Sequence, residues 1–420
     1  MNISREKFML FGALASGALY SAQVIDEIPA QLLLAIVPLA CGVMALPRVF
    51  GKSASFAITL RNSRGLIALF GLLGAYLFVH MIAKADLKTL ERLVQVLIAF
   101  LCMVGGATLE PVTRTVRGGR EQDMKKIIVC AVSLAIVIAL TIVVAVSSGD
   151  AKNKHAYSLF FCLTLAWAVI RRKKLDSDNA GIAVLSFLAI VVGLATDTRG
   201  LAVYALFCVG IAMLCKLPLI GRFAARYVFI PIVVFLAVYV IYYEAIATFG
   251  DRLLWSAFHY TGRTALSGRQ DIWPAYIQAF YKDPIFGVGP SAIPDVENTH
   301  GYRVSAHNFY LQYATEFGLV GLAIVILIMR SIWRTVSLSR TRNPLALSVV
   351  LMVVMANSTE ALLLENMFYV GICQWILIGM ALAAARRSYL CAQPVEDDAA
   401  CATGPAIGLA GLRPSTGESL

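Results

Sequence analysis

His307 to Trp333 reads HNFYLQYATEFGLVGLAIVILIMRSIW, and this stretch decides the fold. Polar side chains crowd its beginning, and no charged residue interrupts the run from Gly318 to Met329. A helix rises about 1.5 Å per residue, so roughly 20 apolar residues cross a hydrocarbon core of about 30 Å. Residues 309–332 therefore predict a membrane-spanning helix that carries its polar residues at one membrane surface.

The rest of the chain has the same character. Of its 420 residues, 59% are hydrophobic and 15% are charged, whereas soluble domains have about 45–50% apolar and about 25% charged residues. This composition excludes a water-soluble enzyme, a nucleic-acid-binding protein and a disordered chain. The runs lack the alternation of a membrane β-barrel, so we expect an all-α polytopic protein with about twelve spans, near 8–24, 28–46, 65–83, 90–109, 127–146, 156–170, 180–196, 200–217, 227–247, 309–332, 344–364 and 367–385.

Loop charges orient these spans. With the N-terminus in the cytoplasm, the inner connections hold most of the Arg and Lys residues, as the positive-inside rule requires. The short outer connections hold only Lys84, Lys88, Lys152, Lys154 and Arg199. Both termini are therefore predicted to be cytoplasmic, and the net charge of +11 is explained by basic residues that face membrane lipids.

Four regions follow from this topology. Residues 1–247 are expected to hold the first nine spans, and 309–387 the last three. Residues 248–308 form one large outer loop, and 388–420 read as a disordered cytoplasmic tail. Within the loop, helical spacing of aromatic residues predicts an interfacial helix over 270–281, with Trp273 and Tyr276 at headgroup level and Pro274 in its first turn.

Three polar residues near the outer surface suggest chemistry. Arg199 lies in the short outer turn TDTRG, Arg269 begins the interfacial helix, and His307 precedes the tenth span. Two guanidinium groups suit a diphosphate, which they bind through paired hydrogen bonds, and an imidazole suits a general base for a hydroxyl nucleophile. The alternatives are that Arg199 contacts lipid headgroups, Arg269 caps loop carbonyls and His307 is an ordinary hydrogen-bonded residue.

Other residues rank below these three. Arg263 and Arg303 are candidate phosphate or glycan contacts, and Glu316 suggests a role because an acidic group inside a span is costly. Arg92 is expected to pair with Glu91 or Glu110 and is given no function, as are Asp197, Glu360 and Glu365. The nine cysteines contain no C-x-x-C pair and predict neither a disulfide framework nor a metal site.

A set of four motifs resembles the O-antigen ligase and polymerase superfamily. The pieces are Thr198-Arg199-Gly200, then Gly268-Arg269 through Trp273, then the P-x-x-G-x-G run from Pro284 to Gly289. The last is His307-Asn308 followed by Leu311, Glu316, Gly318 and Gly321.

This resemblance implies a GT-C-type glycosyltransferase of the bacterial inner membrane. Such an enzyme takes a glycan from undecaprenyl diphosphate on the periplasmic face, inverts the anomeric carbon, and needs no metal or other cofactor. By the same resemblance, Arg199 and Arg269 bind the diphosphate, His307 activates the acceptor hydroxyl, and Asn308 belongs to the substrate-binding motif.

The acceptor is left open within the superfamily. A ligase transfers the polymer to lipid A–core, a polymerase transfers it to another lipid-linked glycan, and a related branch glycosylates pilin. The single late outer loop and the chain length look most like the ligases. A lipid-linked glycan transporter is a further alternative, and a purely structural membrane protein would explain neither Arg199 nor the long loop.

Overall fold

The computed structural model describes residues 64–108, 199–214, 227–245, 269–293, 305–337, 344–364 and 368–390, with a few isolated positions between 160 and 193 and at 217, 248 and 249. Within these ranges all regular structure is helical, which agrees with the predicted all-α class. The elements are α4 (Arg64–Lys84), α5 (Lys88–Thr108), α9 (Arg199–Leu214), α11 (Phe229–Ile241), α14 (Arg269–Lys282), the 3₁₀ helix η1 (Pro290–Ala292), α15 (Phe309–Ser337), α16 (Pro344–Ala356) and α17 (Phe368–Leu390).

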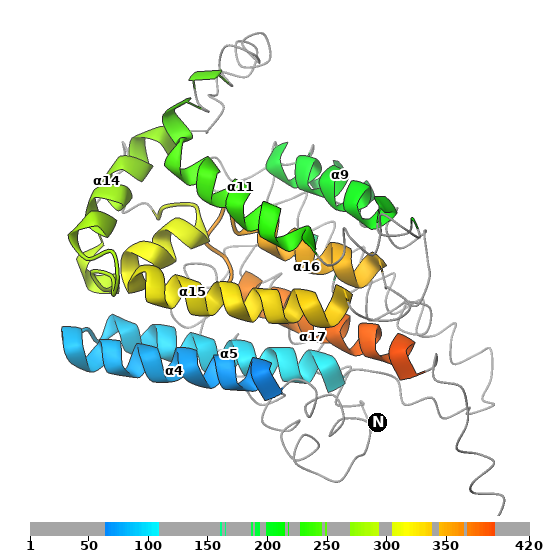
Figure 1. Ribbon diagram of the computed structural model, residues 1–420, viewed down its shortest axis with the longest axis horizontal. Helices are drawn as coiled ribbons and strands as arrows, with labels where there is room; N and C mark the ends of the chain where they lie inside the picture. Colours follow the sequence, from blue (N-terminus) through cyan, green and yellow to red (C-terminus); the bar gives the residue numbers. More distant parts are fainter. Residues whose placement is uncertain are drawn as a thin grey trace, which may run out of the picture.

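Helix α15 lies at the centre of the bundle (Figure 1). It contacts α4, α11, α14, α16 and α17, whereas α4 and α5 pair on one side and α9 packs against α16 on the other. Three of the described helices, α4, α5 and α15, are long and apolar enough to cross a membrane. Leu72, Phe78, Val79 and Ile82 of α4 remain exposed, as expected for a face that contacts lipid.

Six predicted spans coincide with described helices, although their ends differ. A seventh predicted span, over 344–364, agrees only in part. Helix α16 ends at Ala356, and the chain continues as a buried loop over 357–364. Helix α17 continues to Leu390, beyond the predicted start of the tail at residue 388. The predicted spans at 8–24, 28–46 and 127–146 lie outside the described residues, and those at 156–170 and 180–196 lie mostly outside them.

Helices α5 and α17 pack backbone to backbone. A Cβ atom at Gly106 would collide with the backbone of Ile376, and one at Gly379 would collide with the backbone of Met103. Small residues permit such close approach between membrane helices, where apolar burial drives association only weakly. The two glycines therefore fix the crossing of α5 and α17.

Helix α15 is broken at Gly318, whose φ of 64° is in the left-handed region. The break separates four backbone groups that an unbroken helix would pair with one another: the carbonyls of Thr315 and Glu316 and the N–H groups of Leu319 and Val320. Such groups must find other partners at membrane depth, because lipid offers none.

The loop from Pro284 to Gly289 supplies those partners. The N–H groups of Val288 and Gly289 donate to the carbonyls of Thr315 and Glu316, both at 3.0 Å. The N–H groups of Leu319 and Val320 donate to the carbonyls of Pro284 and Ile285 at 2.9 and 3.2 Å. The P-x-x-G-x-G and E-x-G motifs are thus two halves of one structure, which we call the kink clip (284–289 and 315–320).

Tyr76 of α4 completes the kink clip. Its hydroxyl lies 2.7 Å from the carbonyl oxygen of Phe317 and 3.0 Å from that of Phe286, one on each half of the clip. Gly287, with a φ of 85°, packs against the backbone of Glu316 so closely that a Cβ atom would collide with it. Glycine is required here by both conformation and space.

We predict that Gly318→Ala destabilises the protein strongly. The new Cβ atom would meet the backbone of Ile285, and a left-handed conformation costs a non-glycine residue about 1–2 kcal/mol before that collision is counted. Gly71→Ala is the matched control, because nothing lies within 4 Å of its Cβ position inside α4. Thermal unfolding in detergent should show a large loss for Gly318→Ala and no loss for Gly71→Ala; equal melting temperatures would contradict the clip.

Asp86, between α4 and α5, fixes the other end of the same loop. Its carboxylate accepts hydrogen bonds from the backbone N–H of Ser291 (2.9 Å), the Ser291 hydroxyl (2.6 Å) and the Lys88 N–H (2.9 Å). Burial alone would raise the pKa of Asp86, but these hydrogen bonds outweigh it and hold the pKa below its ordinary value. Nearby, Lys84 lies 2.7 Å from Asp283 and lowers the pKa of that carboxyl group.

The lowered pKa values predict acid sensitivity of this loop. A carboxyl group whose pKa is lower in the folded state stabilises the fold above its unfolded pKa of about 4, and the contribution disappears as the pH falls through the folded value. The melting temperature should therefore fall as the pH drops below about 4. Asp86→Ala should melt lower at pH 7 and lose less on acidification, and an unchanged pH profile in this variant would refute the assignment.

Candidate functional site

Helix α14 is attached to the start of α15 through Trp273. The indole N–H donates to the carbonyl of Ala306 at 2.8 Å, and Tyr239 and Tyr243 of the α11 region make edge-to-face contacts with the ring. Trp273 and Tyr276 are fully buried and therefore contact protein rather than headgroups; that they lie at headgroup level stays a prediction. Their rings anchor α14 to protein because neighbouring aromatic rings and a buried carbonyl offer better partners than lipid. Pro274 lies inside α14, beyond its first turn.

Asn357 shapes the loop that follows α16. Its Oδ1 accepts hydrogen bonds from the N–H groups of Leu362 and Leu363, and its Nδ2 donates to the carbonyl of Val353 and to Gln374 Oε1. Its own carbonyl accepts the Phe309 N–H at 2.9 Å. A single buried amide therefore ends α16, folds the 357–364 loop back and attaches it to the first residue of α15.

Glu360 of that loop joins two of the residues singled out in the sequence. Its carboxylate lies 2.8 Å from His307 Nδ1 and 3.6 Å from Arg269 Nη2. The same Nη2 donates to the carbonyl of Thr359 at 2.6 Å. The side chains are 4% (Glu360), 12% (Arg269) and 23% (His307) exposed, so a buried carboxylate supports a more accessible imidazole. We call Arg269, His307 and Glu360 the outer triad.

The backbone at His307 is strained. Its φ of 46° lies in the left-handed region that non-glycine residues rarely adopt. Asn308, which is buried, follows as the N-cap of α15, with Oδ1 accepting the Leu311 N–H at 3.0 Å. The cap and the Glu360 contact hold the histidine in this conformation, and such strain tends to occur at functional positions.

The outer triad can prepare an imidazole for proton abstraction. The ion pair with Arg269 favours the carboxylate form of Glu360, and a carboxylate only accepts hydrogen bonds. Nδ1 of a neutral His307 therefore carries the proton, and its lone pair resides on Nε2. This tautomer lets Nε2 act as a base.

Glu316 is engaged in a buried ion pair. Arg92 Nε and Nη2 lie 3.1 and 3.3 Å from its two carboxylate oxygens, and Gln312 Nε2 donates to Oε1 at 3.1 Å. Arg92 also donates to Gln95. Glu316 was not one of the two partners expected from sequence, of which Glu110 lies outside the described residues. Both oxygens of Glu316 are thus bound by protein groups that join α5 to α15 just before the kink.

Three further candidates from the sequence are Arg199, Arg263 and Arg303. Arg199 is the first residue of α9, as expected for a residue at the start of the eighth span. Arg263 and Arg303 lie outside the described residues. Within the described ranges, no group of three or more His, Cys, Asp or Glu side chains is placed to hold a metal ion.

We predict that breaking the Arg92–Glu316 pair is costly. Removal of one partner leaves the other charge buried, which typically destabilises by about 3–5 kcal/mol. Glu316→Gln and Arg92→Met should each lower the melting temperature, while the double variant should lose less than the sum of the two. Strict additivity in this double-mutant cycle would show that the pair is not coupled.

The fold and the outer triad define a helical membrane protein with a carboxylate-supported histidine at one end of its central helix. A family model described as O-antigen ligase matches residues 184–326, a segment that contains Arg199, Arg269 and His307. The match confirms, over this segment, the resemblance to the O-antigen ligase superfamily that the four motifs show. A search of curated proteins found no significant match.

The match supports a membrane enzyme of the O-antigen ligase or polymerase type. Glu360 lies beyond the matched segment and was noted in the sequence without a role. The available signal was its charge within an apolar run, because ionisable residues in spans are usually functional. That Glu360 contacts His307 and Arg269 could not be inferred, since α15 and α16 lie between them along the chain.

Proposed function

We propose that the protein is an O-antigen ligase that transfers a glycan from undecaprenyl diphosphate to a sugar hydroxyl of lipid A–core at the periplasmic face of the inner membrane. The observation that carries this proposal is the outer triad, in which Glu360 contacts both His307 and Arg269. The family match supports the general class of enzyme; the reaction and the residue roles are inferred from the chemistry of the triad.

His307 acts as the general base in this proposal. Nε2 removes the proton from the acceptor hydroxyl as its oxygen attacks the anomeric carbon from the face opposite the leaving group. The bond from that carbon to the diphosphate oxygen breaks, and the electron pair leaves with the lipid diphosphate. Glu360 holds the ring and stabilises the imidazolium that forms, the role of the carboxylate in a hydrolase triad.

Arg269, together with Arg199, binds the diphosphate. Negative charge grows on the leaving oxygen as the glycosidic bond breaks, so guanidinium groups that contact it stabilise the transition state more than the ground state. Arg269 is held in place by Thr359 and Glu360 on the same loop that supports His307. The loop therefore couples the positions of the base and the anion-binding group.

We predict that His307→Ala lowers the transfer rate by about 10²-fold or more, the usual contribution of a positioned base. Glu360→Gln should lower it by at least about tenfold, because an amide can donate to Nδ1 and thereby favour the wrong tautomer. The assay combines purified enzyme, lipid-linked O-antigen and rough lipopolysaccharide, and separates the products on a gel.

The controls separate catalysis from folding. Glu244→Gln is matched to Glu360→Gln because Glu244 lies just past α11, where its carboxylate bonds only to the neighbouring Tyr243 among the described residues. It should transfer and melt as the wild type does. Glu360→Gln should melt lower because it leaves the Arg269 charge without its buried partner, so every rate is measured well below the melting temperature of the variant. Full activity in His307→Ala would remove the base from the mechanism, and longer lipid-linked chains without modified lipopolysaccharide would identify a polymerase instead.

A further inference from the structure

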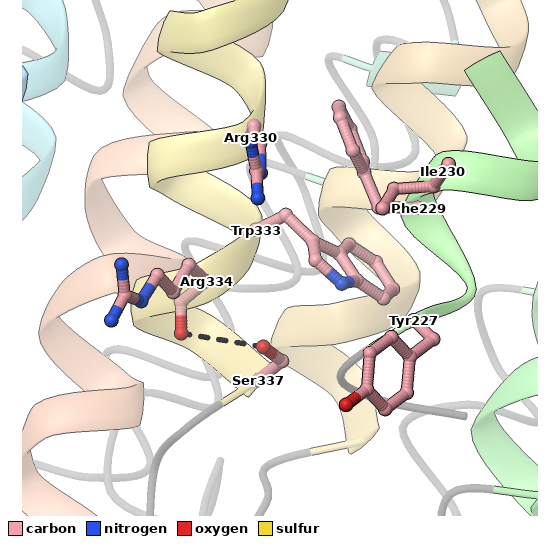
Figure 2. Close-up of a pocket in the computed structure, with 7 residues that line it drawn as sticks. All are labelled: Tyr227, Phe229, Ile230, Arg330, Trp333, Arg334 and Ser337. Atoms are coloured by element: carbon pink, nitrogen blue, oxygen red, sulfur yellow. Dashed lines mark hydrogen bonds between the residues drawn. The ribbon is translucent and has the colours of Figure 1, made fainter. Parts of the chain in front are cut away.

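A second site lies at the far end of α15 from the outer triad. A pocket of about 370 Å³ is lined by Tyr227, Phe229 and Ile230 at the start of α11 and by Arg330, Trp333, Arg334 and Ser337 of α15 (Figure 2). Arg330 and Arg334 lie in the last two turns of α15, beyond the break at Gly318, whereas His307 and Phe309 lie at its beginning. The pocket therefore lies at the membrane boundary opposite the proposed active site.

The floor of the pocket is aromatic and rigid. The Phe229 and Trp333 rings stack with centroids 6.2 Å apart, and both side chains are buried. Figure 2 shows the Trp333 ring between α15 and the start of α11, with Tyr227 below it. Tyr and Trp concentrate where hydrocarbon gives way to headgroups, because one part of each ring is apolar and another part is polar.

The wall on α15 is positively charged. Arg330 and Arg334 are one helical turn apart and exposed, and no carboxylate within the described ranges forms an ion pair with either. Planar guanidinium groups bind phosphate oxygens through paired hydrogen bonds. Figure 2 shows the Arg334 side chain directed away from Tyr227 and Phe229, so Arg330 is the group placed to contact a ligand and Arg334 adds positive charge at the edge of the pocket. Such a wall favours an anionic ligand that carries a phosphate.

The surface beside the pocket is apolar. Ile230, Val234, Val238 and Ile241 follow one another along the lipid-facing side of α11, and all four are exposed. A ligand whose phosphate occupies the pocket would lay an acyl chain along this strip toward the membrane centre. A small soluble anion would use the arginines but gain nothing from the strip.

We propose that this pocket binds one anionic phospholipid of the surrounding bilayer, with its phosphate at Arg330 beside the positive charge of Arg334, and an acyl chain along the Ile230–Ile241 face of α11. Basic pockets between membrane helices are suited to such headgroups. The site is independent of the proposed transferase reaction. It would link the positions of α11 and α15, and α15 carries the outer triad at its other end.

Native mass spectrometry of the full chain in detergent tests the proposal. Phosphatidylglycerol is titrated against wild type, against Arg330→Gln/Arg334→Gln and against Arg64→Gln, which removes an exposed arginine at the start of α4 outside the pocket lining. We expect one tightly retained lipid on wild type and on Arg64→Gln. Affinity should be at least about tenfold weaker in the double variant, because one charge-assisted contact and a neighbouring positive charge are lost.

Two competing compounds, added to the same measurement, identify the ligand. Glycerol phosphate offers the phosphate without a chain, and phosphatidylcholine offers a chain and phosphate without net charge; neither should displace phosphatidylglycerol. Efficient displacement by glycerol phosphate would mean a soluble-anion site and would overturn the lipid proposal. Equal retention by wild type and the double variant would also overturn it.

A folding control accompanies these measurements. Arg330→Lys keeps the charge but loses the planar fork, so it should bind with intermediate affinity while melting at the wild-type temperature. Phosphatidylglycerol should raise the melting temperature of wild type more than that of the double variant. If phosphatidylglycerol raises the melting temperature of all variants equally, Arg330 and Arg334 do not bind the lipid and the proposal fails.

Discussion

Every backbone polar group at membrane depth needs a partner, and this requirement governs the structure around α15. The helix breaks at Gly318, which would leave carbonyl and N–H groups unpaired in lipid. The loop from Pro284 to Gly289 bonds to those groups from outside the helix. Because this loop follows α14 directly, the repair of the kink also fixes where α14 lies.

The position of α14 in turn brings the outer triad together. Arg269 is at the start of α14, His307 precedes α15, and Glu360 belongs to the loop after α16. Trp273 attaches the first of these elements to the second, and Asn357 attaches the third to the second. The proposed site therefore lies where three separately anchored segments converge, which gives it the rigidity that catalytic geometry requires.

Much of this was predictable. Apolar length located the helices now seen as α4, α5, α9, α11, α15 and α17, because a span needs a long apolar run whatever its neighbours are. The interfacial helix over 270–281 was found to within a residue at each end. The environment of Trp273 was not predicted, since an aromatic face looks the same in sequence whether it meets headgroups or other aromatic rings. The buried loop over 357–364 was also missed, because its polar start, Asn357 to Glu360, lies between two apolar runs that together are long enough for one span.

The sequence by itself determined that this is a helical membrane protein, and it marked Arg269 and His307 as residues of interest. Composition and charge suffice for that, because hydrocarbon thickness and lipid charge act on each segment separately. Only the tertiary structure decided that Glu360 supports His307, that Glu316 pairs with Arg92, and that two glycine motifs form one clip. Those facts depend on contacts between segments far apart in the chain, and no local pattern of residues specifies which distant groups will meet.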